Sequence, residues 1–176
     1  GMVMQCQPAI DCIRDVKSRL DGSVRTIYMS PQGSVFSHEK AKELLGYDNL
    51  ILLCGHYEGI DERIIDLEID EEISIGDFVL TGGELPAAIV VDSVSRMVDG
   101  VLPSSECYEN ESIAGGLLEY PQYTRPRSFE GLEVPEVLTN GNHAQIEAWK
   151  HKQALERTIR KRPDIYEKYI KSNGNE

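Results

Sequence analysis

Three loops that contain glycine each follow an apolar segment of the chain. In a parallel sheet, loops at this position are the ones that bind a ligand. The segments span residues 24–30, 50–54 and 69–80, the last a strand pair or one bent strand, and the loops read SPQGS, CGHYEG and LTGGE. Glycine lets other groups approach the backbone closely because it has no side chain. A tight turn explains each loop taken singly. Three such loops at the carboxyl ends of strands favour a site that holds a ligand through backbone N–H and C=O groups.

Familiar phosphate, metal and redox motifs are absent from the sequence. It contains neither G-x-G-x-x-G nor G-x-x-x-x-G-K-[ST], so no standard dinucleotide or phosphate loop is predicted. The acidic segment DLEIDEE (66–72) lacks the D-x-D-x-D-G spacing of a calcium loop and is interpreted as solvated surface. His56 has no second histidine at helical spacing, and the four cysteines form no C-x-x-C pair, so no metal or redox site is predicted. The thiols are expected to be reduced, with Cys54 buried.

One arginine and several carboxylates outside the glycine loops have side chains suited to acid–base chemistry. Arg96 lies near the end of the apolar run VVDSVSRMV, and the sequence leaves open whether it is paired or simply lies near solvent. A polar segment contains four glutamates, Glu106, Glu109, Glu111 and Glu119. Composition alone indicates that their side chains are solvated. A carboxylate on a segment that folds over a ligand could still act as a general base.

Hydrophobic periodicity indicates the elements that carry these loops. It predicts an amphipathic helix after Pro8, a helix capped by Ser37, a short helix over residues 60–67 and the strongest helix over residues 85–98. The run at 50–54 is apolar throughout, as in a parallel strand that is covered on both faces. Strand, loop and helix recur three times, so we predict an α/β fold with a parallel sheet and helices on both faces.

The second part of the chain differs in composition. Residues 100–116 are polar, contain glycine and show no periodicity, which is typical of a linker. A helix is predicted from about His143 to the residue before Pro163. Its apolar positions are Ile146, Trp149, Leu155 and Ile159. The predicted organisation is a first domain over residues 1–102, an interdomain linker over 103–120 and a small all-helical domain over 121–176.

Charge is distributed unevenly along the 176 residues, whose net charge is -12. Residues 1–143 hold 10 Lys and Arg against 25 Asp and Glu, whereas residues 144–176 hold 8 against 5. The basic segment indicates either a nucleic-acid partner or a solvated helix face, and charge alone does not decide between them. No apolar run approaches the roughly 18 residues that span a membrane, and nothing reads as a signal peptide. We therefore predict a cytoplasmic protein without a membrane segment.

Several long motifs occur in one order and identify a family. The motifs are CGHYEGIDER, EIDEEISIGDFVLTGGELPA and LLEYPQYTRP. With them the chain resembles the bacterial tRNA (guanine-N1)-methyltransferases, the TrmD family of the SPOUT class. The resemblance extends from Gly1 to at least Tyr166. The resemblance implies a parallel sheet with a deep C-terminal trefoil knot, S-adenosylmethionine as cofactor, tRNA as substrate and a homodimer with shared active sites. The cofactor-binding residues that it implies are Met29, Ser30, Pro31, Cys54, Gly55, His56, Tyr57, Glu58, Gly59, Ile75, Gly76, Phe78, Leu80, Gly82, Gly83 and Pro86.

The same resemblance implies roles for the acid–base candidates. Guanine N1 carries a proton that must leave before N1 can attack a methyl group, and negative charge then gathers on O6. Glu111 matches the position of the general base, and Arg96 matches the cation that stabilises this charge. The family usually has Asp where Glu111 stands, so Glu109 and Asn110 stay open as alternatives. Substrate contacts are implied for Ser112, Glu119, Lys150, Arg157 and Arg160.

The chain departs from the family pattern at two further points. Phe78 stands where tyrosine is common, which removes one hydroxyl contact. The family's N-terminal strand and helix precede the position of Gly1, so the cofactor-binding domain is expected to be truncated and methyl transfer to be impaired. A requirement for Mg²⁺ is also implied, although no dedicated metal cage is evident in the sequence.

The predicted activity is methylation of N1 of the guanine immediately 3′ of the tRNA anticodon. The departures from the family pattern leave one alternative, a catalytically impaired protein that binds tRNA or cofactor. A SPOUT methyltransferase that acts on another RNA is the second alternative.

Overall fold

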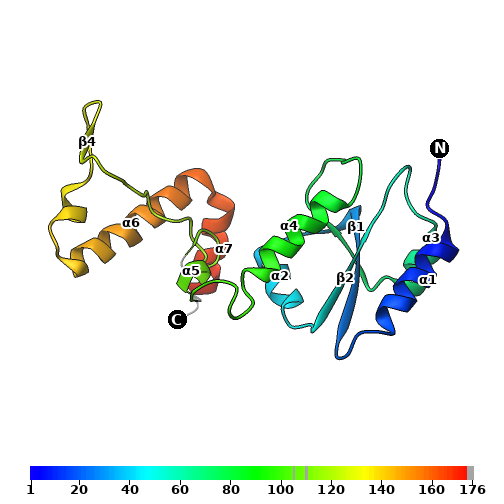
Figure 1. The fold of residues 1–176 in the computed structure, drawn as a ribbon. Coiled ribbons are helices and arrows are strands. Elements are labelled where there is room, and N and C mark those ends of the chain that lie inside the picture. The colour runs from blue at the N-terminus through cyan, green and yellow to red at the C-terminus, as the bar shows by residue number, and fades with distance from the viewer. Residues whose placement is uncertain (105, 110, 174–176) are drawn as a thin grey trace. The chain divides into compact units, whose positions relative to one another are not determined.

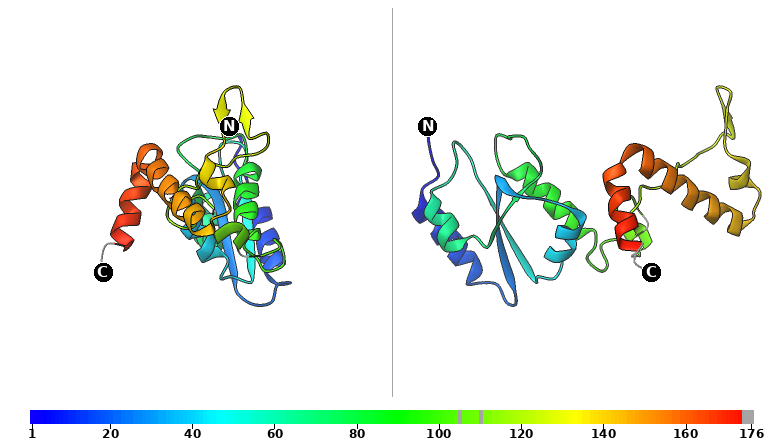
Figure 2. Two further views of the ribbon diagram at one scale, coloured as in Figure 1. Left: turned by 90° about the vertical axis from the view of Figure 1, so that its left-hand side faces the viewer. Right: turned by 180° about the vertical axis from the view of Figure 1, so that it is seen from behind.

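The computed structural model describes residues 1–104, 106–109 and 111–173, and the chain divides into two compact units. The first unit comprises residues 1–104 and the second residues 105–176. Each unit has its own helices and its own sheet, as Figures 1 and 2 show. The three glycine-bearing loops all belong to the first unit.

A three-stranded parallel sheet forms the centre of the first unit. Its strands are β1 (Val24–Val35), β2 (Asn49–Cys54) and β3 (Glu71–Ser74), in the order β2-β1-β3. Ile27 on the central strand and Ile73 on β3 are fully buried. Every residue of β2 is only half-buried, because β2 lies at the edge of this sheet and is less covered than its apolar run predicts. The predicted α/β fold with a parallel sheet is confirmed.

β1 is longer than the apolar run that predicted it. The strand continues because Ser34 and Val35 pair with β3 after a register shift that lies between Met29 and Ser34. Gly33 permits this extension, since a Cβ at this position would overlap the backbone of Glu72. The segment SPQGS is therefore part of a strand that carries one wall of a cavity, and not a free loop.

β3 is shorter than predicted. The chain turns away from the sheet after Ser74, whose side-chain oxygen accepts a hydrogen bond from the N–H of Gly76 at 3.1 Å. The apolar residues that follow face solvent, and Phe78 and Val79 are 54% and 84% exposed. Residues 77–80 form a loop, so the expected strand pair or single bent strand over this segment is wrong.

Helices cover both faces of the sheet (Figures 1 and 2). α1 (Cys6–Lys17) packs against α3 (Glu62–Glu68), and α2 (His38–Leu44) packs against α4 (Glu84–Ser95) on the opposite face. All four helices were predicted, although α1 begins before Pro8 and α4 ends before the last apolar residues of its run.

Local sequence signals explain why these helices form where they do. Ile10 and Ile13 of α1 pack with Ile64 of α3 in a buried apolar cluster. The side chain of Ser37 accepts a hydrogen bond from a backbone N–H in the first turn of α2, as predicted for a helix cap. Pro86 lies in the first turn of α4, where its missing N–H costs no helical hydrogen bond.

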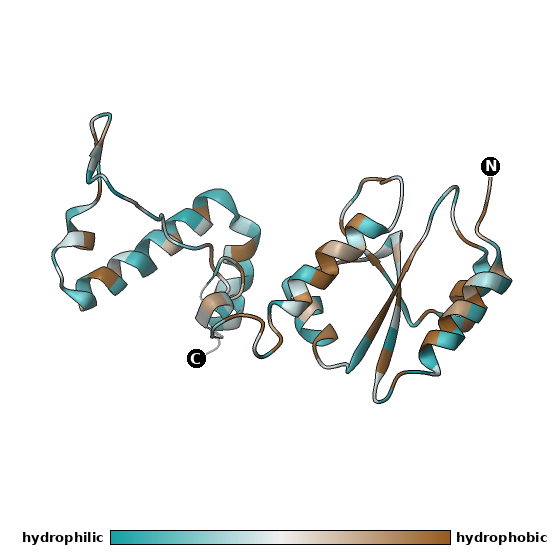
Figure 3. Cartoon of the chain, viewed as in Figure 1, coloured by the Kyte–Doolittle hydropathy of each residue, from teal (hydrophilic) through white to brown (hydrophobic). Residues whose placement is uncertain are grey.

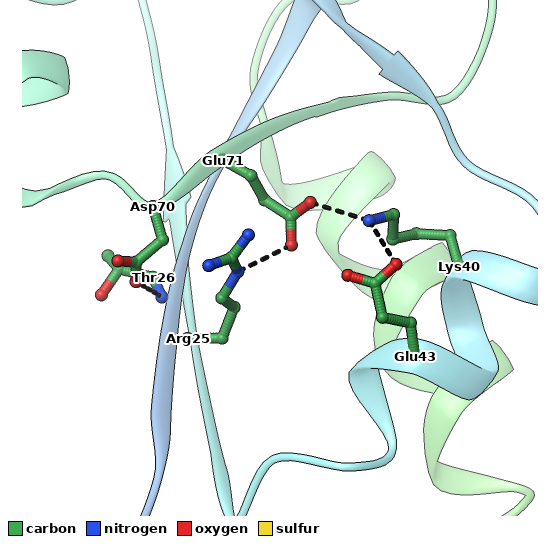
Figure 4. Close-up of polar contacts among 6 residues, drawn as sticks. All are labelled: Arg25, Thr26, Lys40, Glu43, Asp70 and Glu71. Atoms are coloured by element: carbon green, nitrogen blue, oxygen red, sulfur yellow. Dashed lines mark hydrogen bonds and ion pairs between the residues drawn. The ribbon is translucent and has the colours of Figure 1, made fainter.

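An ionic network joins β1, β3 and α2 (Figure 4). Arg25 Nε donates to Glu71 Oε1 at 3.0 Å, and Lys40 Nζ lies 3.0 Å from Glu71 Oε2. Lys40 also contacts Glu43, 2.7 Å away. Burial raises the pKa of Glu71, but the hydrogen bonds from Arg25 and Lys40 outweigh it, so the pKa lies below its ordinary value of 4.5. The network ties together the two strands whose ends reach the glycine loops.

Replacing Glu71 by Gln is expected to lower the free energy of unfolding by about 1–3 kcal/mol, because Arg25 and Lys40 lose their shared carboxylate. Urea denaturation at pH 7 measures the change. Glu43→Gln is the matched control: Glu43 is 51% exposed and its carboxylate pairs with Lys40 near solvent, so its loss should stay below about 1 kcal/mol. Equal losses for the two variants would contradict the assignment.

The contribution of Glu71 should also depend on pH in a defined direction. Its pKa is lower in the folded state, so the contribution is present above the unfolded-state value near 4.5. It should disappear as the pH falls through the lowered folded-state pKa. The stability difference between the parent and Glu71→Gln is therefore expected to shrink in acid.

The second unit is mostly helical, and the prediction of an all-helical domain is wrong. Its elements are α5 (Glu106–Glu109), β4 (Ser128–Phe129), β5 (Leu132–Glu133), the 3-10 helix η1 (Glu136–Thr139), α6 (His143–Lys161) and α7 (Pro163–Asn173). β4 and β5 form an antiparallel hairpin, and its turn residues Glu130 and Gly131 have φ values of 50° and 80°. Positive φ at both central positions is typical of a tight hairpin turn. Strands of two residues offer no alternation that a sequence reading could detect.

α6 begins at His143 and ends before Pro163, as predicted. Figure 3 shows it as mostly hydrophilic, with separate hydrophobic positions. Its buried residues are Ala154 and Thr158, whereas Ile159, expected among the apolar positions, is 47% exposed. The buried face is displaced by one residue, and on it the Thr158 hydroxyl accepts a hydrogen bond from the backbone N–H of Leu118 at 2.8 Å.

Candidate functional site

A cavity of about 280 Å³ lies at the carboxyl ends of the parallel strands in the first unit. Residues 28–32 of β1 form one wall, and residues 55–60, which follow β2, form a second. Residues 73–76 and 78–83 form the third wall, and Pro86 of α4 together with Glu62 and Ile65 of α3 completes the lining. Parallel strands bring their carboxyl ends to one edge of a sheet, which explains why loops distant in sequence meet here.

Most of the residues expected to bind the cofactor line this cavity. They are Met29, Ser30, Pro31, Gly55, His56, Tyr57, Glu58, Gly59, Ile75, Gly76, Phe78, Leu80, Gly82, Gly83 and Pro86. Cys54 is not in the lining, and its backbone lies behind Gly83. The lining also contains residues that the sequence did not indicate, namely Tyr28, Gln32, Ile60, Glu62, Ile65, Ile73, Ser74 and Thr81. Most of them are direct neighbours of a predicted residue, a signal that could have found them, whereas Glu62, Ile65 and Ile73 are not.

Two glycines in the lining let neighbouring side chains pack directly against the backbone. Gly76 has a φ of +140°, which L residues rarely adopt, and a Cβ there would lie 2.8 Å from the ring of Phe78. A Cβ on Gly82 would lie 2.8 Å from the ring of His56 and would overlap the carboxylate of Glu84. The missing side chains therefore leave room for the Phe78 ring and for the pair of His56 and Glu84, which stand close to the backbone of the third wall.

A polar contact links two of the walls. His56 Nε2 lies 2.5 Å from Glu84 Oε1 and joins the loop after β2 to the first turn of α4. A hydrogen bond from its own backbone N–H, and then the one with His56, lower the pKa of the Glu84 carboxyl. The carboxylate is therefore ionised at neutral pH and can hold the His56 ring in place.

Tyr28 brings a hydroxyl group to the lining. Burial, and then the nearby charge of Glu72, raise the pKa of Tyr28, so the hydroxyl keeps its proton at neutral pH. A Cβ on Gly55 would lie 2.9 Å from this hydroxyl, so glycine leaves room beside it. Together with the apolar side chains of Met29 and Ile73, the cavity offers polar backbone, hydroxyl groups and apolar surface. Such a lining suits a ligand that has both polar and apolar parts.

The two predicted catalytic residues belong to different units. Arg96 of the first unit is the C-cap of α4; it is half-buried, and its N–H donates to a carbonyl of the preceding turn at 3.2 Å. Glu111 of the second unit follows α5; it is half-buried, and its N–H donates to the carbonyl of Tyr108 at 3.4 Å. Of the alternatives, Glu109 is exposed at the end of α5, and Asn110 lies outside the described residues.

Three of the predicted substrate residues are joined by hydrogen bonds within the second unit. The N–H of Glu119 donates to Ser112 Oγ at 2.9 Å, and Arg157 Nη1 donates to the carbonyl of Glu119 at 3.4 Å. Lys150 lies two turns before Arg157 on α6, and its Nζ contacts a glutamate one turn away at 2.8 Å. Arg160 is exposed near the end of α6 and takes no part in these hydrogen bonds.

Metal-binding clusters, thiols and membrane-spanning helices bear on three of the expectations from the sequence. Within residues 1–104, 106–109 and 111–173, no group of three or more His, Cys, Asp or Glu side chains could hold a metal ion. In the same ranges, no helix is long and apolar enough to cross a membrane. The four cysteines are free, and Cys54 is half-buried, not buried as predicted. Burial, and then the charge of Glu84, raise the pKa of the Cys54 thiol.

The sheet and the cavity together define an α/β protein with a ligand pocket at the carboxyl edge of parallel strands. A family model described as tRNA (Guanine-1)-methyltransferase TrmD matches residues 1–168. The chain belongs to this family, and the resemblance that its motifs indicated is confirmed.

Curated relatives agree with this membership. A tRNA (guanine-N(1)-)-methyltransferase of Ruminiclostridium cellulolyticum is 57% identical over 173 residues, which cover 98% of this chain and 74% of the relative. The protein of the same name from Lachnospira eligens is 52% identical over 176 residues, 100% of this chain and 75% of the relative. The one from Staphylococcus aureus strain Newman is 50% identical over 175 residues, 99% of this chain and 71% of the relative.

Proposed function

We propose that the protein transfers a methyl group from S-adenosylmethionine to N1 of the guanine immediately 3′ of the tRNA anticodon. The observation that carries the proposal is the cavity walled by glycine loops, in a chain whose relatives are named tRNA (guanine-N(1)-)-methyltransferases. A lining that combines backbone, hydroxyl groups and apolar side chains fits a nucleoside that carries a sulfonium.

The cofactor would be held by the three walls of this cavity. When bound, S-adenosylmethionine supplies an electrophilic methyl group on its sulfonium. The residues that would hold it are those at 29–31, 54–59 and 75–83 that the resemblance names, together with Pro86. The contact between His56 and Glu84 supports this role, because it keeps the second wall and the start of α4 together.

Glu111 and Arg96 would carry out the acid–base chemistry. Glu111 would take the proton from guanine N1, since N1 cannot act as a nucleophile while it holds that proton. Arg96 would stabilise the negative charge that develops on O6. The hydrogen bonds that join Ser112, Glu119 and Arg157 hold the segment directly after Glu111, which supports a positioning role for them.

Contacts to tRNA phosphates would come from α6. Lys150, Arg157 and Arg160 supply positive charge in the segment where Lys and Arg outnumber Asp and Glu. A protein with a net charge of -12 can still bind RNA through such a local basic surface. A tRNA substrate also agrees with the cytoplasmic location that we propose.

We assign residues 1–102 to cofactor binding, 103–120 to the linker and 121–176 to tRNA binding, and we infer that the first domain contains the family's trefoil knot. Support for the knot comes from the close passage of the loops that follow β2 and β3. The N–H of Gly83 donates to the carbonyl of Gly55 at 3.1 Å, and a Cβ on Gly83 would meet the backbone of Cys54.

We also propose a homodimer with shared active sites, with α4 in its interface. Leu85, Ile89 and Val91 of this helix are 67%, 45% and 53% exposed, and Val98 just beyond it is 44% exposed. Figure 3 shows hydrophobic residues along much of α4. A surface helix normally exposes a polar face, so an apolar one indicates an interface.

Replacing Ile89 by Asp is expected to convert the dimer into monomers at micromolar concentration, because an interface would bury the new carboxylate without a partner. Analytical ultracentrifugation measures the change. Leu67→Asp is the matched control: Leu67 is 60% exposed on α3, which lies on the other face of the sheet, and this variant should stay dimeric. A monomeric parent, or an Ile89→Asp variant that sediments as a dimer, would contradict the proposed interface.

Transfer of a labelled methyl group to a tRNA transcript tests the proposed activity. Nucleoside analysis should find 1-methylguanosine, and a transcript with adenine at the target position should accept no label there. Label in another RNA but not in tRNA would favour the alternative SPOUT activity. Binding of both tRNA and cofactor without transfer would favour an impaired protein. Chelation with EDTA in the same assay tests the proposed requirement for Mg²⁺.

A further inference from the structure

A second cavity, of about 540 Å³, lies within the second unit. It is formed by residues 120–125, by the chain on either side of the hairpin and by one face of α6. Val134, Leu138 and Ile146 give it an apolar floor, and these three residues are half-buried. Its volume lies within the range of roughly 300–1,000 Å³ that is typical of ligand pockets. The proposed methyl transfer gives no role to this cavity as a whole.

Aromatic rings are available at the cavity. Tyr123 lines it and is 46% exposed, and the ring of Trp149 lies beside the Tyr123 ring, with 6.4 Å between centroids and a tilt of 50°. Tyr120 also lines the cavity, and Lys150 Nζ lies 5.0 Å from the centroid of its ring. Exposed aromatic rings of this kind are the surfaces on which unpaired nucleobases stack.

The charged residues described in the lining are all cations, namely Arg125, Arg127 and Lys150. Neither arginine forms an ion pair with another residue in the described part of the chain. Lys150 contacts Glu147 at 2.8 Å, and this hydrogen bond raises its pKa, so it keeps its charge. Two unpaired guanidinium groups beside exposed rings favour a ligand that combines an anion with a flat ring, as a nucleotide does.

We infer that this cavity binds one unstacked nucleotide of the RNA substrate, with the base against Tyr123 and the phosphate at Arg125 and Arg127. The inference rests on the proposed function, because it takes RNA as the ligand. The phosphate contacts proposed for α6 would then be joined by a contact with one single-stranded nucleotide. Bases in a duplex are covered by their neighbours, so the ligand must come from a loop or an end of the RNA.

Tyr123→Ala is expected to raise the Kd for a tRNA transcript by about 5- to 150-fold, the effect of losing one stacked base. Filter binding at fixed salt measures it. Tyr123→Phe keeps the ring and should restore most of the affinity. Phe129→Ala is the matched control, because Phe129 is 63% exposed on the hairpin and is not among the lining residues. That variant should bind the transcript as the parent does.

Two further measurements separate stacking from general charge. Arg125→Gln and Arg127→Gln should each lower the slope of log Kd against log salt concentration by about one, whereas Tyr123→Ala should leave the slope unchanged. Binding of a fully paired RNA duplex should be the same for the parent and for Tyr123→Ala. Circular dichroism checks that each variant is folded.

The outcomes distinguish this inference from the proposed function. If Tyr123→Ala binds tRNA as tightly as the parent, the inference is overturned, whether or not the parent methylates guanine. An acidic protein as the true ligand would give the same unchanged affinity for RNA. If the parent forms no 1-methylguanosine while Tyr123→Ala loses affinity for tRNA but not for duplex RNA, the proposed function fails and the nucleotide site stands.

Discussion

Glu111→Gln is expected to lower kcat for methyl transfer to tRNA by about 10²–10⁴-fold, because an amide cannot accept the proton of guanine N1. Gln matches Glu in size, so folding and tRNA affinity should stay near those of the parent. The affinity for S-adenosylmethionine, measured by calorimetry, should also be unchanged, since the proposed cofactor cavity is lined by residues of the first unit. Single-turnover rates at saturating tRNA separate this chemistry from product release.

Two further variants make the result specific to Glu111. Glu109→Gln is the matched control, because Glu109 is exposed and lies two residues away, and we expect a rate close to that of the parent. Glu111→Asp withdraws the carboxylate by about 1 Å, a displacement that can cost about a hundredfold in rate. A loss of rate in Glu109→Gln but not in Glu111→Gln would assign the base to Glu109. If Glu111→Gln and Glu111→Asp both match the parent, Glu111 is not the base.

The helices of the first unit could be predicted because their signals are local. The Ser37 cap and the spacing of Ile10 and Ile13 depend on residues three or four positions apart. The length of β1 could not be predicted, because it depends on pairing with a strand about forty residues further along the chain. The reason for Gly33 is visible only when Glu72 lies beside it.

The cavity was predictable from topology, whereas the contacts that stabilise it were not. Parallel strands bring their carboxyl ends to one edge of the sheet, so the meeting of β1 with the glycine loops after β2 and β3 follows from the order of the elements. The network that Glu71 forms with Arg25 and Lys40 joins residues 46 and 31 positions apart, and no pattern in the sequence marks those pairs. The roles proposed for Arg96 and Glu111 rest on the family resemblance alone, because the two residues belong to different units.

Gly83 allows a test of whether the cavity wall requires a residue without a side chain, because an alanine there would add only a Cβ. Its φ of -82° is negative and its ψ is -5°, a backbone conformation that is open to L residues such as alanine. A Cβ would nevertheless lie 2.6 Å from the Cα of Cys54 and 3.0 Å from the backbone nitrogen of Gly55. These are backbone atoms, which cannot rotate away as a side chain can. A shift would also strain the hydrogen bond from the Gly83 N–H to the Gly55 carbonyl.

Gly83→Ala is therefore expected to lower the free energy of unfolding by about 1–3 kcal/mol, the usual cost of an extra carbon in a packed site. We expect the Kd for S-adenosylmethionine to rise at least about tenfold, a loss of about 1.4 kcal/mol in binding, because two walls of the cavity must move apart. Urea denaturation and calorimetry measure the two effects.

Gly82→Ala is the matched control for this prediction, one residue away and with the same added carbon. Its Cβ would meet the ends of the Glu84 and His56 side chains, which can rotate aside, so its loss of stability should stay below about 1 kcal/mol. The difference between the two variants depends only on what each new carbon touches. Two outcomes would contradict the prediction: equal losses of stability in the two variants, or a Gly83→Ala variant with the stability and cofactor affinity of the parent. Either would show that the close backbone passage between β2 and α4 does not shape the cofactor cavity.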